Sequence, residues 1–156
     1  MKMVGGETEE TIPQSLRFEL RNQFLEQPES DLFHHLCEAL GDRVIVCPKV
    51  RAADVIYMPN AAEQIDQAVR IDRKFIDYLV CDRVTRRPVC AIQLDRAPQG
   101  SKSPVYDQFL EGALKTAGLS VLHLRTDRAP SQQMIRERIS PLLEKRSIRR
   151  VDSAGS

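Results

Sequence analysis

The chain has 156 residues, of which 42 % are apolar and 29 % are charged, and its formal net charge is +1. These values are typical of one globular domain with its own core, and they give the chain as a whole no electrostatic preference for nucleic acid. No apolar run approaches the roughly 20 residues that a membrane span needs, and residues 1–7 lack the apolar region of a secretory signal. We therefore expect a cytoplasmic protein.

The two ends of the chain differ in composition from its middle. Residues 1–13 are expected to be disordered, because they combine glycines and acidic residues with few apolar side chains. Residues 14–27 form either an N-terminal arm or a short helix, since apolar residues recur in them at helical spacing. We expect the folded domain over 28–146 and a basic flexible tail over 147–156.

The first clear helix is predicted from Ser30, which suits the N-cap position, to Gly41, which suits the C-cap. The apolar stretch 44–47 then predicts a strand that meets a bend at Pro48. Residues 60–71 are polar with few apolar side chains, which is typical of a short helix or a loop.

Two mostly apolar stretches, 74–82 and 88–95, predict neighbouring strands joined by a hairpin turn. A polar side chain interrupts each of them: Asp77 lies in the first, and Gln93 lies in the second, which ends at Asp95. A carboxylate inside a buried strand is costly unless it is paired, hydrogen-bonded or bound to a metal. These polar residues are therefore the candidate functional site.

A helix is predicted over 105–117, a buried strand over 119–124 and an amphipathic helix over 131–146. Consecutive strands joined by short turns, followed by a helix that crosses to one more strand, predict a mixed sheet with helices on its faces. The expected fold class is α/β or α+β, in a single domain.

The cysteines and histidines do not indicate a metal centre. The four cysteines lack Cys-x-x-Cys spacing, and none of the three histidines has a partner at metal-ligand spacing. We interpret the thiols as buried core groups, and the imidazoles, including that of His123 in the last strand, as packing or surface groups.

Four motifs carry a resemblance to a known superfamily. They are Lys-x-x-Asp-Tyr-Leu-Val-Cys-Asp over 74–82, Pro-Val-x-Ala-Ile-x-Leu-Asp over 88–95, Asp-x-Phe over 107–109 and Ala-Gly-Leu over 117–119. Residues 28–125 resemble the PD-(D/E)XK nuclease superfamily, and within it a bacterial family of small restriction-endonuclease-like domains related to very-short-patch-repair endonucleases. The resemblance implies a mixed sheet flanked by helices, a DNA partner and Mg²⁺-dependent hydrolysis of phosphodiesters.

In that superfamily an Asp on one strand and a Glu on the next hold Mg²⁺, and a Lys two residues after the Glu helps to activate water. By resemblance, Asp77 takes the place of the Asp, Gln93 that of the Glu and Asp95 that of the Lys. These three are the candidate catalytic residues, and Asp77 and Gln93 are the candidate Mg²⁺ ligands. The candidate supporting residues are Glu29, Lys74 and Asp107.

The chain departs from the superfamily pattern at Gln93, because an amide oxygen is a neutral and weaker ligand for Mg²⁺ than a carboxylate. The following loop has Gln99 where the nearer family has a His, and Tyr106 stands where that family has an Arg. Two functions therefore stay open: a Mg²⁺-dependent endonuclease, and a catalytically silent nuclease fold that binds nucleic acid or a partner protein.

Each candidate site residue also has a purely structural interpretation. Asp77 can pair with Lys74 or cap a neighbouring element, and Gln93 can be an ordinary half-buried amide. Asp95 ends its strand just before a loop, where an Asx-turn is an alternative role.

Basic residues cluster in two places although the net charge is near zero. One cluster surrounds the predicted hairpin turn and includes Arg86 and Arg87, and the other occupies 145–150. Arg86, Arg87 and Lys102 are the candidate DNA contacts, because arginine and lysine neutralise phosphates; a solvated surface is the structural alternative. A protein-interaction module that docks through the N-terminal arm is the remaining functional alternative.

Overall fold

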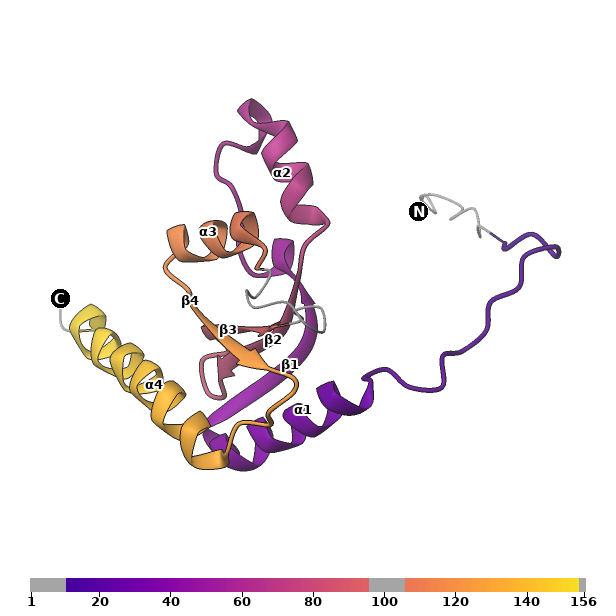
Figure 1. Ribbon diagram of the computed structural model, residues 1–156. Helices are drawn as coiled ribbons and strands as arrows, with labels where there is room; N and C mark the ends of the chain where they lie inside the picture. The colour runs from indigo at the N-terminus through magenta and orange to yellow at the C-terminus, as the bar shows by residue number, and fades with distance from the viewer. Residues whose placement is uncertain (1–10, 96–105, 155–156) are drawn as a thin grey trace, which may run out of the picture.

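The protein is described by a computed structural model that covers residues 11–95 and 106–154 (Figure 1). Its helices and strands, in chain order, are α1 (Gln27–Leu40), β1 (Val44–Arg51), α2 (Ile65–Asp72), β2 (Phe75–Asp82), β3 (Pro88–Asp95), α3 (Gln108–Thr116), β4 (Ser120–Arg125) and α4 (Gln132–Ala154). Three single 3₁₀ turns lie between them: η1 (Gly41–Arg43), η2 (Ala52–Asp54) and η3 (Ala61–Glu63). Within the described part of the chain, none of the helices is both long and apolar enough to cross a membrane.

The four strands form one sheet in the order β1-β2-β3-β4. Strand β2 runs antiparallel to both of its neighbours, β1 and β3, whereas β4 runs parallel to β3 because α3 carries the chain across the sheet between them. The predicted α+β fold class, a mixed sheet flanked by helices, is confirmed. The sheet leaves β1 and β4 as its two edge strands.

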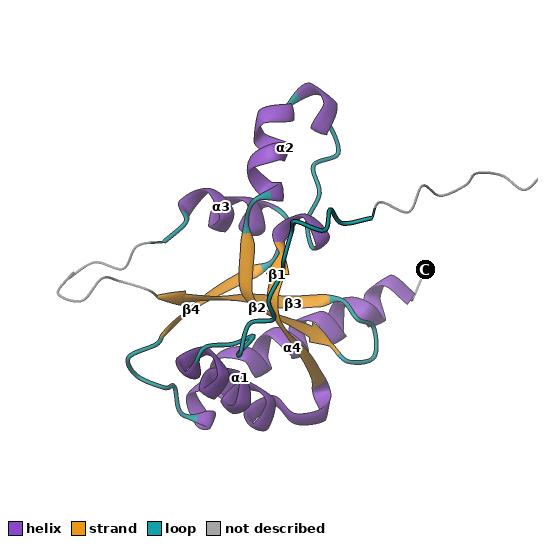
Figure 2. Ribbon diagram, turned by 90° about the vertical axis from the view of Figure 1, so that its right-hand side faces the viewer, coloured by secondary structure: helices purple, strands orange, loops and turns teal. Residues whose placement is uncertain are grey.

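Helices cover both faces of the sheet (Figure 2). On one face, α1 and α4 enclose a core cluster with β-strand residues such as Val80 and Ile92. On the other face, α3 and the segment that follows β1 enclose a second cluster around Ala91 and Leu114. The two faces therefore have separate cores, and side chains that alternate along each strand point into one or the other.

The two long helices fold because their apolar residues recur every four positions. In α1 this row is Leu32, Leu36 and Leu40, and in α4 it is Ile135, Ile139 and Leu143. All six side chains are buried, and each contributes about 1.5–3 kcal/mol when it is fully removed from water.

Helix α1 begins earlier than its sequence indicates. It starts at Gln27, so Glu26 rather than Ser30 is the N-cap residue, and the prediction for Ser30 is wrong. The N–H of Glu26 donates a hydrogen bond to the carboxylate of Glu29 at 3.3 Å, and Pro28 occupies the first turn, where its missing N–H is not needed. Gly41 does end the helix, with a positive φ of 57°.

Strand β1 continues through Pro48 to Arg51, so the bend predicted at Pro48 does not end the strand. Pro48 lies opposite Tyr78 in the ladder with β2. An edge strand tolerates proline, because one of its two sides has no hydrogen-bonding neighbour.

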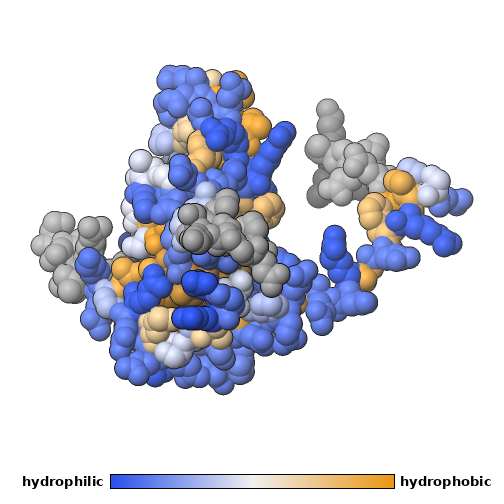
Figure 3. Space-filling model, in the orientation of Figure 1, coloured by the Kyte–Doolittle hydropathy of each residue, from blue (hydrophilic) through white to orange (hydrophobic). Residues whose placement is uncertain are grey.

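Both ends of the described chain differ from their predictions. Residues 11–26 contain no helix, and most of their apolar side chains are exposed, as Figure 3 shows; the short-helix alternative for 14–27 is therefore wrong. A short amphipathic segment without a core to pack against has little reason to become helical. Helix α4 continues to Ala154, so the flexible tail predicted over 147–156 is wrong for 147–154. Extending a helix that has already formed costs less than starting one, because each added residue gains a backbone hydrogen bond.

Candidate functional site

Three polar side chains form a row across the sheet. Asp77 lies on β2, Gln93 is its cross-strand neighbour on β3, and His123 lies opposite Gln93 on β4. The residues two positions along each strand, such as Leu79 and Ala91, belong to the core on the α3 face, so the row points to that face. We call Asp77, Gln93 and His123 the polar row.

The start of α3 closes over the polar row. Nε2 of His123 lies 3.0 Å from a carboxylate oxygen of Glu111, and the ring of Tyr106 lies 3.8 Å from the imidazole ring, centroid to centroid. These groups surround a small hollow of about 160 Å³. Its lining residues are Asp77, Gln93, Leu94, Tyr106, Asp107, Glu111 and His123.

Asp77 and Gln93 connect β2 to β3 through their side chains. The backbone N–H of Asp77 donates to Oε1 of Gln93 at 2.9 Å, and the N–H of Leu94 donates to Oδ2 of Asp77 at 2.8 Å. The backbone ladder between these strands extends only as far as the pair Tyr78–Ile92. The two side chains therefore replace backbone acceptors where the ladder ends, which gives both residues a structural role.

Lys74 and Asp107, two of the predicted supporting residues, meet at the rim of the hollow. Lys74 Nζ donates to Oδ2 of Asp107 at 2.5 Å, and Oδ1 of Asp107 accepts from the N–H of Leu110 at 3.0 Å. Asp107 is thus the N-cap of α3 as well as the partner of a cation. The helix predicted to start at Val105 starts instead at Gln108, directly after this cap.

The carboxylates at the start of α3 are held in their charged form. Partial burial by itself raises the pKa of Asp107, but the hydrogen bond from Lys74 and that from the N–H of Leu110 together hold this pKa below its usual value. For Glu111, the hydrogen bond from Lys115 and the nearby His123 lower the pKa.

Replacing Asp107 should separate its capping role from its charge. We expect Asp107→Ala to lower the free energy of unfolding by about 1–2 kcal/mol, because the cap and the partner of Lys74 are both lost. Asp107→Asn keeps the cap and should cost about 0.5 kcal/mol. Urea denaturation of the wild type and both variants measures these differences.

The same variants test the lowered pKa of Asp107. A carboxyl group whose pKa is lower in the folded than in the unfolded state stabilises the folded protein. This stabilisation is complete above the pKa of the unfolded state and is lost as the pH falls through the pKa of the folded state. The stability difference between the wild type and Asp107→Asn should therefore persist at neutral pH and vanish well below the ordinary pKa of 3.8. A difference that grows as the pH falls would contradict the assignment.

The donor set of the polar row does not fit Mg²⁺. Oδ2 of Asp77 and Oε1 of Gln93 already accept backbone N–H groups, and Gln93 contributes no charge. In the part of the chain that the structure describes, no three His, Cys, Asp or Glu side chains form a group that could hold a metal ion. No catalytic step through a metal follows from these residues, and the Mg²⁺ site stays a prediction.

The other predicted residues do not line the small hollow. Asp95 lies two positions after Gln93 on β3, on the same face of the sheet, and is opposite Arg125 at the end of the strand. Glu29 accepts a hydrogen bond at its backbone carbonyl from the hydroxyl of Tyr78, whose side chain belongs to the core on the α1 face, so Glu29 is not on the α3 face. Lys102 lies outside the described residues.

Arg86 and Arg87 lie at the opposite end of the β2–β3 hairpin. With a rise of about 3.3 Å per residue, the five residues from Asp77 to Asp82 place the turn about 17 Å from the polar row. The predicted DNA contacts and the predicted catalytic residues therefore do not form a single site.

His123 and Glu111 were not among the candidates from the sequence. Their contact joins a helix to a strand that comes 12 residues later, and it depends on how α3 lies over the sheet. The sequence offered one signal for His123. It lies between apolar residues of a strand, two positions after Val121, so the two side chains are on the same face of the sheet.

Comparison with known proteins identifies a family. Residues 21–142 match the model of a family described as a protein of unknown function (DUF2726). No curated protein and no solved structure matches the chain.

Proposed function

The chain belongs to the DUF2726 family, and we propose that it is a nuclease-like domain that binds nucleic acid without hydrolysing it at the polar row. The resemblance of its motifs to the PD-(D/E)XK superfamily supports DNA as the partner. The hydrogen bonds that Asp77 and Gln93 accept support a structural use of the two positions to which the resemblance assigns Mg²⁺. The surface that supports binding lies elsewhere, at the hairpin.

The observation that carries this proposal is a concentration of cations beside the β2–β3 turn. Arg83, Arg86 and Arg87 are exposed in this turn, and the N–H of Arg83 donates to the carbonyl of Arg43, so a fourth exposed arginine lies next to them. The oxygen Oδ1 of Asp82 accepts the N–H groups of Val84 and Thr85, which fixes the turn that presents these arginines. We call Arg43, Arg83, Arg86 and Arg87 the basic edge.

Helix α4 lies next to the basic edge. The turn lies beside the C-terminal half of α4 in both ribbon views (Figures 1 and 2), and Leu143 of α4 shares a core cluster with Val89 at the start of β3. Lys145, which is exposed, belongs to this half of the helix. Several cations on adjacent elements can neutralise successive phosphates, which a single exposed arginine cannot do.

Salt-dependent binding tests the proposal. We expect the full chain to bind labelled duplex and single-stranded DNA at low salt, measured by fluorescence anisotropy. If three phosphates are neutralised, the affinity should fall about 40-fold between about 50 and 200 mM salt, because counterions are released on binding. Gel analysis with Mg²⁺ or Mn²⁺ present should show intact DNA.

Two results would overturn the proposal. Cleavage that disappears in Asp77→Asn would show that the polar row is an active nuclease site. Absence of binding at low salt would remove nucleic acid as the partner, and the exposed apolar residues of 11–26 would then favour the protein-interaction module.

A further inference from the structure

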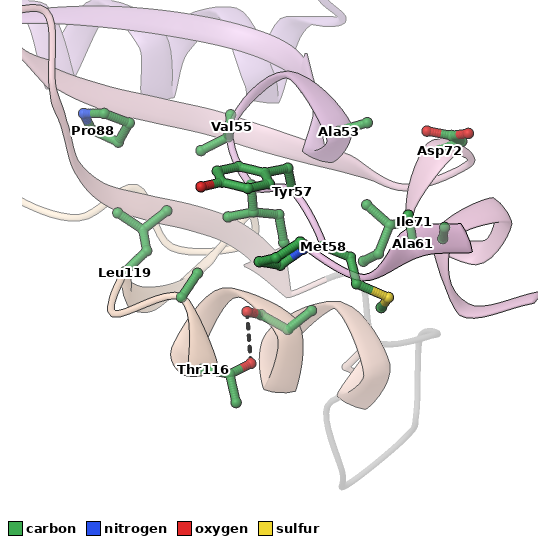
Figure 4. A pocket seen from close by; sticks show the side chains of 15 residues that line it. Ala53, Val55, Tyr57, Met58, Ala61, Ile71, Asp72, Pro88, Thr116 and Leu119 are labelled. Atoms are coloured by element: carbon green, nitrogen blue, oxygen red, sulfur yellow. Dashed lines mark hydrogen bonds between the residues drawn. The ribbon is translucent and has the colours of Figure 1, made fainter. Parts of the chain in front are cut away.

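A second and larger hollow, of about 870 Å³, lies on the α3 face near the hairpin. It is formed by the loop between β1 and α2 together with α2, α3 and the start of β4 (Figure 4). Its lining is mostly apolar and includes Ile56, Met58 and Leu119. The volume is within the usual range of small-molecule pockets.

Tyr57 is the unusual residue of this pocket. Its side chain lies against the pocket in Figure 4, yet the residue is 86 % exposed. An aromatic ring that lines a hollow and is left in water offers a flat surface on which a second ring can stack.

The pocket adjoins the basic edge through the chain itself. Pro88 lines the pocket, and Arg86 and Arg87 directly precede it. Among the described residues, Asp72 is the only charged one in the lining. It lies at the far end from Pro88 in Figure 4, and its Oδ1 is 3.9 Å from Nη2 of Arg51. A phosphate at the basic edge would therefore be a short distance from an apolar hollow with an aromatic wall.

We propose that this pocket receives an unstacked base of single-stranded nucleic acid, which stacks on Tyr57 while its phosphates contact Arg86 and Arg87. The inference rests on the proposed function and adds that the preferred ligand is single-stranded. Duplex DNA contacts only the basic edge, because its bases are stacked inside the double helix. Binding of single strands through a cationic surface and an aromatic ring is sequence-tolerant, because every base has a π-face.

The polar groups of the pocket favour recognition of a base by stacking rather than by hydrogen bonds to its edge. The hydroxyl of Thr116 lies within hydrogen-bond distance of the carbonyls of Gly112 and Ala113, at 2.7 and 2.9 Å, inside its own helix. We therefore expect little difference in affinity between single strands of different base composition.

Tyr57→Ala tests the inference, with Tyr57→Phe as the variant that keeps the ring. In the full chain, Tyr57→Ala should weaken single-strand binding about 5- to 100-fold and leave duplex binding unchanged, whereas Tyr57→Phe should bind both as the wild type does. Phe18→Ala, which removes an equally exposed aromatic ring from the N-terminal arm, should change neither affinity. Because Tyr57 is exposed, thermal unfolding should be nearly the same for all variants.

A base analogue gives a direct readout of stacking. The fluorescence of 2-aminopurine in a single strand should be quenched by the wild type and by Tyr57→Phe, and not by Tyr57→Ala. Wild-type single-strand binding that Tyr57→Ala leaves unchanged, or an equal loss for duplex and single strand, overturns the inference while the proposed function stands. If Tyr57→Ala changes only the oligomeric state, the pocket receives a second copy of the chain and the inference is also overturned.

Discussion

Reversing the charge of Arg86 and Arg87 together, as Arg86→Glu/Arg87→Glu, should weaken DNA binding about 100-fold at low salt. Each substitution removes a phosphate contact and places a repelling carboxylate on an exposed turn. The slope of the logarithm of affinity against the logarithm of salt concentration should fall by about 2, because two fewer counterions are released. Fluorescence anisotropy over a salt series measures both quantities.

A matched variant distinguishes the effect of charges at the basic edge from the effect of the net charge of the protein. Arg17→Glu/Arg21→Glu makes the same change of net charge on exposed residues of the N-terminal arm, and its affinity should stay within about twofold of the wild type. Equal losses in the two double variants would contradict a localised binding surface.

The hairpin must remain folded for this comparison. Arg86 has a positive φ of 63°, a conformation that favours glycine. Arg86→Gly/Arg87→Gln therefore removes both charges with little strain, and we expect an affinity loss of about tenfold with an unchanged unfolding temperature.

Asp77→Ala should lower the free energy of unfolding by about 2 kcal/mol. The substitution leaves the N–H of Leu94 without the acceptor that Asp77 Oδ2 provides, at a place where the ladder between β2 and β3 has ended. For a domain of this size, the unfolding temperature should fall by about 4–8 °C. Chemical and thermal denaturation measure the two values.

The sign of this change distinguishes the two interpretations of Asp77. Asp77→Asn keeps a side-chain oxygen that can accept from Leu94, so it should cost less than about 1 kcal/mol. Residues that serve catalysis often reduce stability, and a protein that becomes more stable in Asp77→Ala would therefore indicate a functional carboxylate. Destabilisation by Ala together with tolerance of Asn supports the structural role.

Local patterns were sufficient to predict most of the elements. Gly41 correctly predicted the end of the helix α1, and the apolar stretches on each side of the arginine-rich turn predicted the hairpin of β2 and β3. Where predictions were wrong, the reason is the presence or absence of another segment packed or hydrogen-bonded against the residues concerned. Pro48 stays in a strand because that strand is an edge, and residues 14–26 do not form a helix because they have no core to cover.

The candidate site was predicted only in part. Asp77, Gln93, Lys74 and Asp107 do lie together at one hollow, but the contact of Glu111 with His123 could not be read from the sequence. It depends on the register of β4 against β3 and on the position of α3 over the sheet, and both are set by packing between distant segments. The pairing of Arg43 with the hairpin turn has the same origin.

Most helices and strands, the mixed α+β class and the presence of polar residues in two apolar strands could be predicted from the sequence, because these depend on periodicity and on neighbours along the chain. How those polar residues are used depends on contacts that exist only in the folded protein. Whether Asp77 and Gln93 are open ligands or hydrogen-bond acceptors depends on which backbone groups approach them across the sheet. Likewise, the chain contains Tyr57 and Arg87 far apart, and only the fold places the apolar pocket beside the basic edge.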